Sequence, residues 1–299
     1  MQTSLNFDFA RLKYRLTRLL QCGLLALPAY ALVPGQANAA FTIFEAGGND
    51  TGPGTAAGAI TPTRDAFRSA VGGGTAAGAN GDFLGVRREI NWDGVPAAFT
   101  DPGLLPANFF NVNSPRGVVF STPGSGFLVS ANTGGAAPPL FGFPLDLQAF
   151  SAQKLFAPIG SGIVDIRFFR PGTTTAATTS AFGAVFADAD YTIATDASTM
   201  QFFDQSDTQI FSRAVTATNN LGLSFLGGVA NAGERIARVR ITTPFNFLVS
   251  NGVRANETND FVVMDDFLYA TPAAVPEPEV WAMVLAGLAI VGWRSRKRT

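Results

Sequence analysis

The segment RREINWDG at residues 87–94 is the densest polar constellation of the chain, and it contains Trp92. A sugar-binding site uses such an aromatic ring with hydrogen-bonding groups beside it. The segment offers these groups in Arg88, Glu89, Asn91 and Asp93. The alternative is that Trp92 packs in the core and Arg88 pairs with a nearby acid, because the chain has 27 Phe against 3 Trp and 4 Tyr. Phenylalanine at this density is typical of a core.

A second candidate site is the acidic pair Asp265-Asp266, which interrupts an apolar terminal strand. A buried carboxylate is costly without a partner, and hard oxygen ligands suit calcium. We therefore predict a structural calcium ion that ties this strand to the opening segment through Glu45 or Asp50. Calcium is the one cofactor that the sequence suggests, and the alternative is that most aspartates form turns.

Composition excludes several other chemistries. The chain has no histidine, and its single cysteine, Cys22, lies in the front apolar stretch. A Ser-His-Asp triad, a histidine base, a zinc helix of the HExxH type and a cysteine nucleophile in the body are all excluded. Ser151-Ala152-Gln153-Lys154 matches the S-x-x-K pattern of penicillin-binding enzymes, but the companion motifs are absent, so we interpret it as a chance match.

Charge argues against a nucleic-acid partner. Residues 40–275 contain 13 Lys and Arg against 19 Asp and Glu, whereas basic residues cluster at both ends of the chain. Binding to phosphates needs a clustered positive face, which this body lacks.

The segment 1–39 is typical of a secretory signal peptide. Four basic residues at positions 11–18 precede an apolar stretch from Leu19 to Val33. Ala37-Asn38-Ala39 then forms a small-residue cleavage site before Ala40. We therefore predict a signal helix, export across the inner membrane, and cleavage by signal peptidase between Ala39 and Ala40.

The last segment, 273–299, has three parts: Pro276-Glu277-Pro278, an uncharged apolar run, and a basic cluster. The run from Val280 to Trp293 would span about 21 Å as a helix, short of a bilayer core of about 30 Å. We predict a short transmembrane helix that tethers the chain before processing. The basic cluster consists of Arg294, Arg296, Lys297 and Arg298.

These three parts, in this order at the end of the chain, resemble the PEP-CTERM sorting signal of Gram-negative bacteria. The resemblance covers the segment 275–299. It implies cutting near the PEP motif by an exosortase, an integral-membrane protease or transpeptidase, and delivery to the cell surface. The body is broadly similar to the uncharacterised β-rich domains that precede this signal, which adds support for the fold only.

Residues 40–86 are rich in Gly, Ala and Thr, and GTAAGA occurs at both 54–59 and 74–79. We predict a surface loop region that holds one short helix, which begins near Thr61-Pro62-Thr63 and ends at Gly72.

Residues 87–272 show short alternating segments separated by Gly, Pro, Asn and Asp. In 235–242, Val239 and Ile241 are expected to face inward while Arg238 and Arg240 face water. About nine such strands without long helices predict an all-β antiparallel sandwich, jelly-roll-like. The predicted strands lie at 117–120, 126–130, 163–169, 181–187, 200–203, 208–212, 223–227, 235–242 and 261–269.

Together these features predict a secreted, surface-directed protein without catalytic activity, structural or adhesive in the envelope or biofilm matrix. One alternative is a carbohydrate-binding module for exopolysaccharide, centred on Trp92. A second is a glycoside hydrolase that uses only carboxylates, for which Glu89 and Glu234 are the candidates.

Overall fold

The computed structural model describes residues 40–190, 197–243, 246–249, 253–254, 261–275, 284–288 and 290. The predicted signal helix and most of the predicted C-terminal helix lie outside these residues. Among the helices of the described part, none has the length and apolar character needed to cross a membrane.

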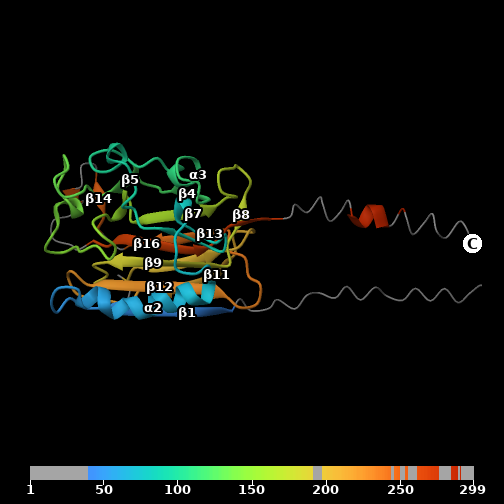
Figure 1. Cartoon of the computed structure of the whole chain (residues 1–299), viewed down its shortest axis with the longest axis horizontal. Helices are drawn as coiled ribbons and strands as arrows, with labels where there is room; N and C mark the ends of the chain where they lie inside the picture. Colours follow the sequence, from blue (N-terminus) through green and yellow to red (C-terminus); the bar gives the residue numbers. More distant parts are fainter. Residues whose placement is uncertain are drawn as a thin grey trace, which may run out of the picture. The chain divides into compact units, whose positions relative to one another are not determined.

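Eight strands define a jelly roll of two antiparallel sheets (Figure 1). Sheet A contains the order β12-β9-β16-β6, and sheet B contains the order β11-β10-β13-β7. Followed along the chain, these strands cross between the sheets in the order of two interlocked Greek keys, so the predicted all-β sandwich is confirmed. Their bounds are β6 Phe156–Ile159, β7 Ile163–Phe168, β9 Ala181–Ala187, β10 Thr199–Phe203, β11 Gln209–Ala214, β12 Leu223–Ala230, β13 Arg238–Thr242 and β16 Val263–Ala270.

Further strands and short helices extend this frame. Strand β1 pairs with β12, β3 pairs with β16 and β2, β5 pairs with β6, and β4 pairs with β7. The additional strands are β1 Phe41–Gly48, β2 Asp82–Phe83, β3 Arg87–Ile90, β4 Val118–Ser121, β5 Gly126–Val129, β8 Ala177–Thr178, β14 Leu248–Val249, β15 Val253–Arg254 and β17 Ala273–Ala274. The helices of the body are α2 Thr55–Val71, α3 Phe109–Val112 and the 3-10 turns η1 Ala79–Gly81, η2 Ala97–Phe99 and η3 Leu140–Gly142. Residues 284–288, in the predicted C-terminal helix, are helical as well.

The apolar residues form two layers, one on each face of sheet A. The inner layer fills the space between the sheets and includes Phe182 and Phe202. The outer layer lies under helix α2, which runs along β1 and β12 (Figure 1). Phe67 of α2 fits against sheet A where β12 has no side chain: a Cβ at Gly227 would lie 2.7 Å from its ring. Glycine at this position therefore allows the helix to approach the sheet.

The prediction for residues 40–86 is wrong in two respects. The segment Phe41–Gly48 is a strand of sheet A, so the sandwich begins before residue 87. The helix begins at Thr55 and includes Pro62 in its interior. It persists there because Ala56, Ile60 and Phe67 lie on one face and are fully buried against the sheet, and packing of an apolar face outweighs local propensity.

The predicted orientation of Arg238 is also wrong, although Val239 and Ile241 are buried as expected. Arg238 is only 4% exposed. Its guanidinium pairs with Asp165 at 2.8 Å and with Asp207 at 2.5 Å, and it lies over the ring of Phe203. The alternating pattern predicted that Arg238 contacts water, but two carboxylates and the face of an aromatic ring surround it instead.

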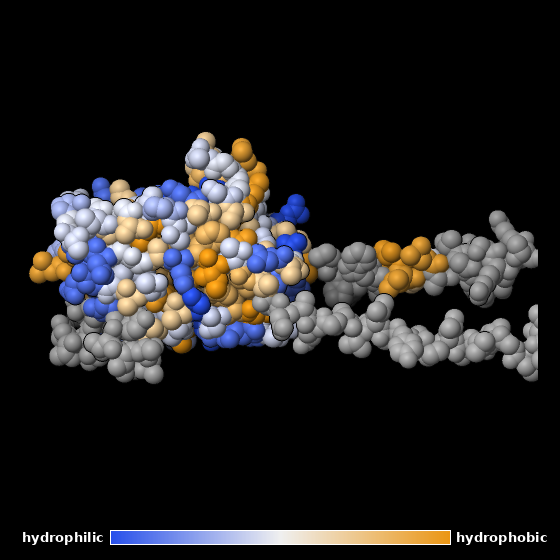
Figure 2. Space-filling view, turned by 90° about the horizontal axis from the view of Figure 1, so that it is seen from below, coloured by the Kyte–Doolittle hydropathy of each residue, from blue (hydrophilic) through white to orange (hydrophobic). Residues whose placement is uncertain are grey.

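The surface of the body mixes polar and apolar side chains, as Figure 2 shows for one face. Large apolar residues that are exposed belong to several different elements, and scattered residues of this kind need no partner to explain them. Those of the body are Ile43, Leu84, Val86, Leu104, Val112 and Leu145.

Candidate functional site

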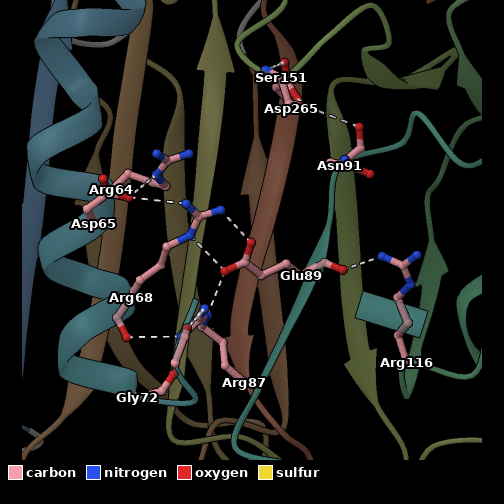
Figure 3. A network of polar contacts seen from close by, with 11 residues as sticks. Arg64, Asp65, Arg68, Gly72, Arg87, Glu89, Asn91, Arg116, Ser151 and Asp265 are labelled. Carbon is pink, nitrogen blue, oxygen red and sulfur yellow. Dashed lines mark hydrogen bonds and ion pairs between the residues drawn. The ribbon is translucent and has the colours of Figure 1, made fainter. Parts of the chain in front are cut away.

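A network of charged side chains lies on the outer face of sheet A, between helix α2, strand β3 and strand β16 (Figure 3). It brings together residues that the sequence assigned to two different sites. Glu89 comes from the predicted sugar site, and Asp265 and Asp266 come from the predicted calcium site. In the structure, the charges of Glu89 and Arg68 act on Asp266, so these residues belong to one electrostatic cluster on one face.

A β-bulge places both aspartates on this face. Met264 and Phe267 of β16 pair with Phe186 and Ala184 of β9, so two residues of β16 oppose one residue of β9. Met264 and Phe267 both belong to the inner layer. Asp265 and Asp266 therefore share the outer face, although neighbouring residues of a regular strand point to opposite faces.

Asp265 is fully buried and is held by the loop before β6. Its carboxylate accepts hydrogen bonds from the backbone N–H of Phe150 at 2.6 Å and from the hydroxyl of Ser151 at 3.0 Å. Burial raises the pKa of Asp265 well above its ordinary value, and the neighbouring Asp266 raises it further. Burial raises the pKa of Asp266 as well. The pair therefore retains a proton at pH values where an exposed carboxyl is ionised.

Glu89 is bound by two arginines. Arg68 of α2 donates to its two carboxylate oxygens at 2.8 and 2.6 Å, and Arg87 donates to one of them at 2.7 Å. Arg87, which is 1% exposed, also donates to the backbone carbonyls of Arg68, Gly72 and Gly74. These carbonyls end helix α2 and the turn after it, where the helix leaves acceptors without partners. The cluster therefore fastens the C-terminal end of α2 to strand β3.

Trp92 is 1% exposed, so it is not a platform for a sugar. Its ring stacks on Phe156 with 4.2 Å between the ring centroids, and its indole N–H donates to the backbone carbonyl of Asp265 at 2.7 Å. The alternative in which Trp92 packs in the core is confirmed. Arg88 lies 3.5 Å from Asp82, which supplies the nearby acid of that alternative.

A pocket of about 350 Å³ lies beside Trp92. Asn91, which was predicted with Trp92, is exposed at this pocket, and Asn80 and Asn113 are exposed there as well. Asp93 lies outside this lining, and its carboxylate accepts a hydrogen bond from the backbone N–H of Lys154. The complete lining is Asn80, Asn91, Trp92, Gly94, Val95, Pro96, Phe99, Phe109, Phe110, Asn113, Ser114 and Arg116.

Ser151 and Lys154 form hydrogen bonds with different partners and not with each other. The Ser151 hydroxyl donates to Asp265, whereas the Lys154 ammonium donates to the carbonyls of Asp93 and Val95 at 3.0 and 2.6 Å. Burial lowers the pKa of Lys154. These separate partners agree with the interpretation of S-x-x-K as a chance match.

The four residues of the predicted calcium site are not brought together. Glu45 lies on β1, three strands away from β16 in sheet A, and pairs with Arg213 at 2.6 Å. At about 4.8 Å per strand, that separation is roughly 14 Å. Asp50 lies after the end of β1, where its backbone N–H donates to Asn219. Within the part of the chain that the structure describes, no three acidic or other metal-ligating side chains form a group that could hold a metal ion.

The residues of the predicted sorting signal, Pro276, Glu277, Pro278 and the terminal basic cluster, lie outside the described residues. So do Ala37 and Ala39 of the predicted cleavage site, whereas Ala40 is described.

Comparisons with known proteins give no relative for this chain: no family model, no curated protein and no solved structure matches it.

Arg87 belongs to the segment 87–94 that the sequence singled out, but its contact with helix α2 was not predicted, and Arg68 was not predicted as a member of the cluster. Arg64 and Arg68 are four residues apart, which places them on the same side of a helix, but the helix itself was predicted to be short. The bulge that turns Asp265 and Asp266 to one face has no sequence signal of its own.

Proposed function

We propose that this chain is an exported, surface-directed β-sandwich protein, sorted by an exosortase, with structural or adhesive work in the cell envelope or exopolysaccharide matrix. Signal peptidase removes the segment 1–39. The C-terminal signal holds the chain at the inner membrane until it is processed. The PEP-CTERM resemblance of the segment 275–299 is the observation that carries this proposal.

The limits of the folded body support it. Strand β1 begins at Phe41, directly after Ala40, and β17 ends at Ala274, shortly before Pro276. Cleavage after Ala39 and near the PEP motif would therefore leave the described sandwich complete.

The contacts of Glu89 and Glu234, the two candidate catalytic carboxylates, support a function in which these two residues do not hydrolyse a substrate. Both oxygens of Glu89 are occupied by arginines, and Glu234 accepts hydrogen bonds from the backbone N–H groups of Ala40 and Ala232. A general acid and a nucleophile must reach a glycosidic bond, and these groups are committed to contacts within the body.

The experiment is surface delivery of the Pro276→Ala and Glu277→Ala variants in the producing bacterium, with Glu279→Ala as a matched control outside the motif. Both motif variants should accumulate in the cell with the C-terminal segment attached, while the control reaches the surface. Normal delivery of both motif variants would exclude the sorting proposal.

A second candidate function is binding of exopolysaccharide, and the pocket beside Trp92 favours it. Three exposed asparagines, Asn80, Asn91 and Asn113, surround this pocket, and amide side chains can both donate to and accept from sugar hydroxyls. The test is a glycan array with Asn91→Ala and Asn113→Ala, and with Asn132→Ala as an exposed control away from the pocket. Binding that both pocket variants retain would eliminate this candidate.

A further inference from the structure

The turn after strand β12 surrounds Ala40, the residue that directly precedes β1. The backbone N–H of Ala40 donates to the carboxylate of Glu234 at 2.6 Å, and the backbone N–H of Asn231 donates to the Ala40 carbonyl at 2.9 Å. The hydroxyl of Thr42 adds a hydrogen bond to the Asn231 side chain at 2.8 Å. One turn therefore holds both backbone polar groups of Ala40.

Glu234 presents a negative charge to this nitrogen. Its second carboxylate oxygen is fixed by the backbone N–H of Ala232 at 2.8 Å, which orients the first oxygen toward Ala40. Burial acts to raise the pKa of Glu234, but backbone hydrogen bonds, of which the one from Ala40 is the strongest, together outweigh it, so the pKa is lowered. Among the ion pairs of the described residues, none includes Glu234. This carboxylate therefore accepts backbone hydrogen bonds but forms no ion pair with a described cationic side chain.

Cleavage between Ala39 and Ala40 supplies the cation at that place. Hydrolysis of this peptide bond consumes one water molecule and leaves a carboxylate on Ala39 and an ammonium group on Ala40. The nitrogen that becomes charged is the one that already donates to Glu234. A hydrogen bond between two ionised groups is shorter and stronger than one from a neutral amide.

We propose that Glu234 is a binding site for the new N-terminal ammonium group of the processed protein. The inference rests on the proposed export and cleavage, and it adds a role for the body in receiving the product of that cleavage. Strand β1 is the edge strand of sheet A beside β12, and chain termini fray unless they are tied down. The ion pair fixes the residue directly before β1, so processing stabilises the pairing of β1 with β12.

The experiment uses processed protein purified from the exporting cells. Its mass and N-terminal sequence first report whether the chain begins at Ala40. The α-amine is then acetylated, which retains an N–H donor and removes the charge. Lys154 is the single lysine between residues 40 and 275 and is 3% exposed, so acetylation at neutral pH is selective for the terminus. Melting temperatures are compared for unmodified and acetylated protein, in the wild type, in Glu234→Gln and in Glu45→Gln.

We expect acetylation to lower the melting temperature by about 1–3 °C in the wild type and in Glu45→Gln, and to change it little in Glu234→Gln. Equal losses in all three proteins, or no loss in the wild type, would overturn the proposed site while leaving export intact. A protein that is secreted but begins at another residue also overturns it. A protein that is neither exported nor cleaved counts against the proposed function itself.

A second measurement needs no substitution. The acetylation rate of an ammonium group bound to Glu234 should be several-fold lower in the native protein than in the protein unfolded in urea. Equal rates, after correction for the effect of urea on the reagent, would contradict the proposal.

Discussion

Arg68 of helix α2 donates a hydrogen bond to each carboxylate oxygen of Glu89 on strand β3, at 2.8 and 2.6 Å. This two-point contact connects the helix, which packs along β1 and β12, to a strand that pairs with β16. Paired bonds of this kind fix orientation as well as distance. Because the side chain of Glu89 is only 12% exposed, the contact is shielded from water and salt.

Removing one partner of this pair should loosen helix α2. We expect Arg68→Met to lower the free energy of unfolding by about 1–3 kcal/mol, because Glu89 then keeps a buried charge with one arginine fewer. Hydrogen exchange of α2 amides should become faster than in the wild type. The matched control is Arg213→Met, which breaks the exposed pair with Glu45 and should destabilise the protein much less than Arg68→Met, because an exposed ion pair contributes little. Equal effects of the two substitutions would contradict the assigned role of Arg68.

The buried acid pair should make stability depend on pH in a definite direction. The pKa of Asp265 is raised by burial and by Asp266, so the folded state retains a proton that the unfolded chain releases above about pH 4. Its contribution is complete at low pH and is lost as pH rises toward the folded pKa. The stability of Asp265→Asn relative to the wild type should therefore improve between about pH 4 and 7, measured by urea unfolding. A constant difference over this range would contradict the raised pKa.

Asp165 in sheet B should behave in the opposite way. Burial acts to raise its pKa, but hydrogen bonds from Arg240 and Arg238 outweigh burial and lower the pKa below its ordinary value. Its contribution is present above the unfolded pKa of about 3.9 and is lost as pH falls. We expect Asp165→Asn to be less stable than the wild type by about 1–3 kcal/mol at pH 7, and the difference to shrink as pH falls below about 4. The same urea series measures it, and a gap that widens toward low pH would show the sign to be wrong.

The sequence predicted the strands of the β-sandwich better than it predicted residues 40–86, the N-terminal part of the fold. All nine predicted strands coincide with strands of the sandwich. Strand β7 alternates in burial as a half-buried strand does, whereas β9 and β16 are buried almost throughout and were recognised as short apolar runs bounded by turn residues. Strand β6 was missed because Phe156–Ile159 has only four residues and contains Pro158, which is unfavourable inside a strand. Strand β1 was missed because its Gly- and Ala-containing sequence resembles the loop that follows it.

The candidate site was predicted in pieces. Glu89 and the pair Asp265-Asp266 were named, but as parts of two separate sites, because they are far apart in sequence and meet only through the pairing of β3 with β16. The orientation of Asp265 and Asp266 depends on a bulge, which is a property of the register between strands. The burial of Arg238 could not be inferred from alternation either, since it depends on Asp207 in the turn before β11.

A substitution of Trp92 distinguishes between a role in the core and a role as a binding platform. Because its ring is enclosed and stacked on Phe156, Trp92→Ala should lower the free energy of unfolding by about 3–5 kcal/mol. Leu145→Ala is the control, since Leu145 is 81% exposed and its loss should change stability by about 0.5 kcal/mol or less. A Trp92→Ala protein as stable as the wild type would restore the platform interpretation.

We propose that the body is exported and is released from a removable signal at each end. Intact mass of the protein recovered from the cell surface or the medium tests it most directly. We predict a chain that begins at Ala40 and ends near Pro276, with any added mass at its new C-terminus. A surface protein whose mass includes the whole segment 275–299 would contradict removal of the C-terminal signal.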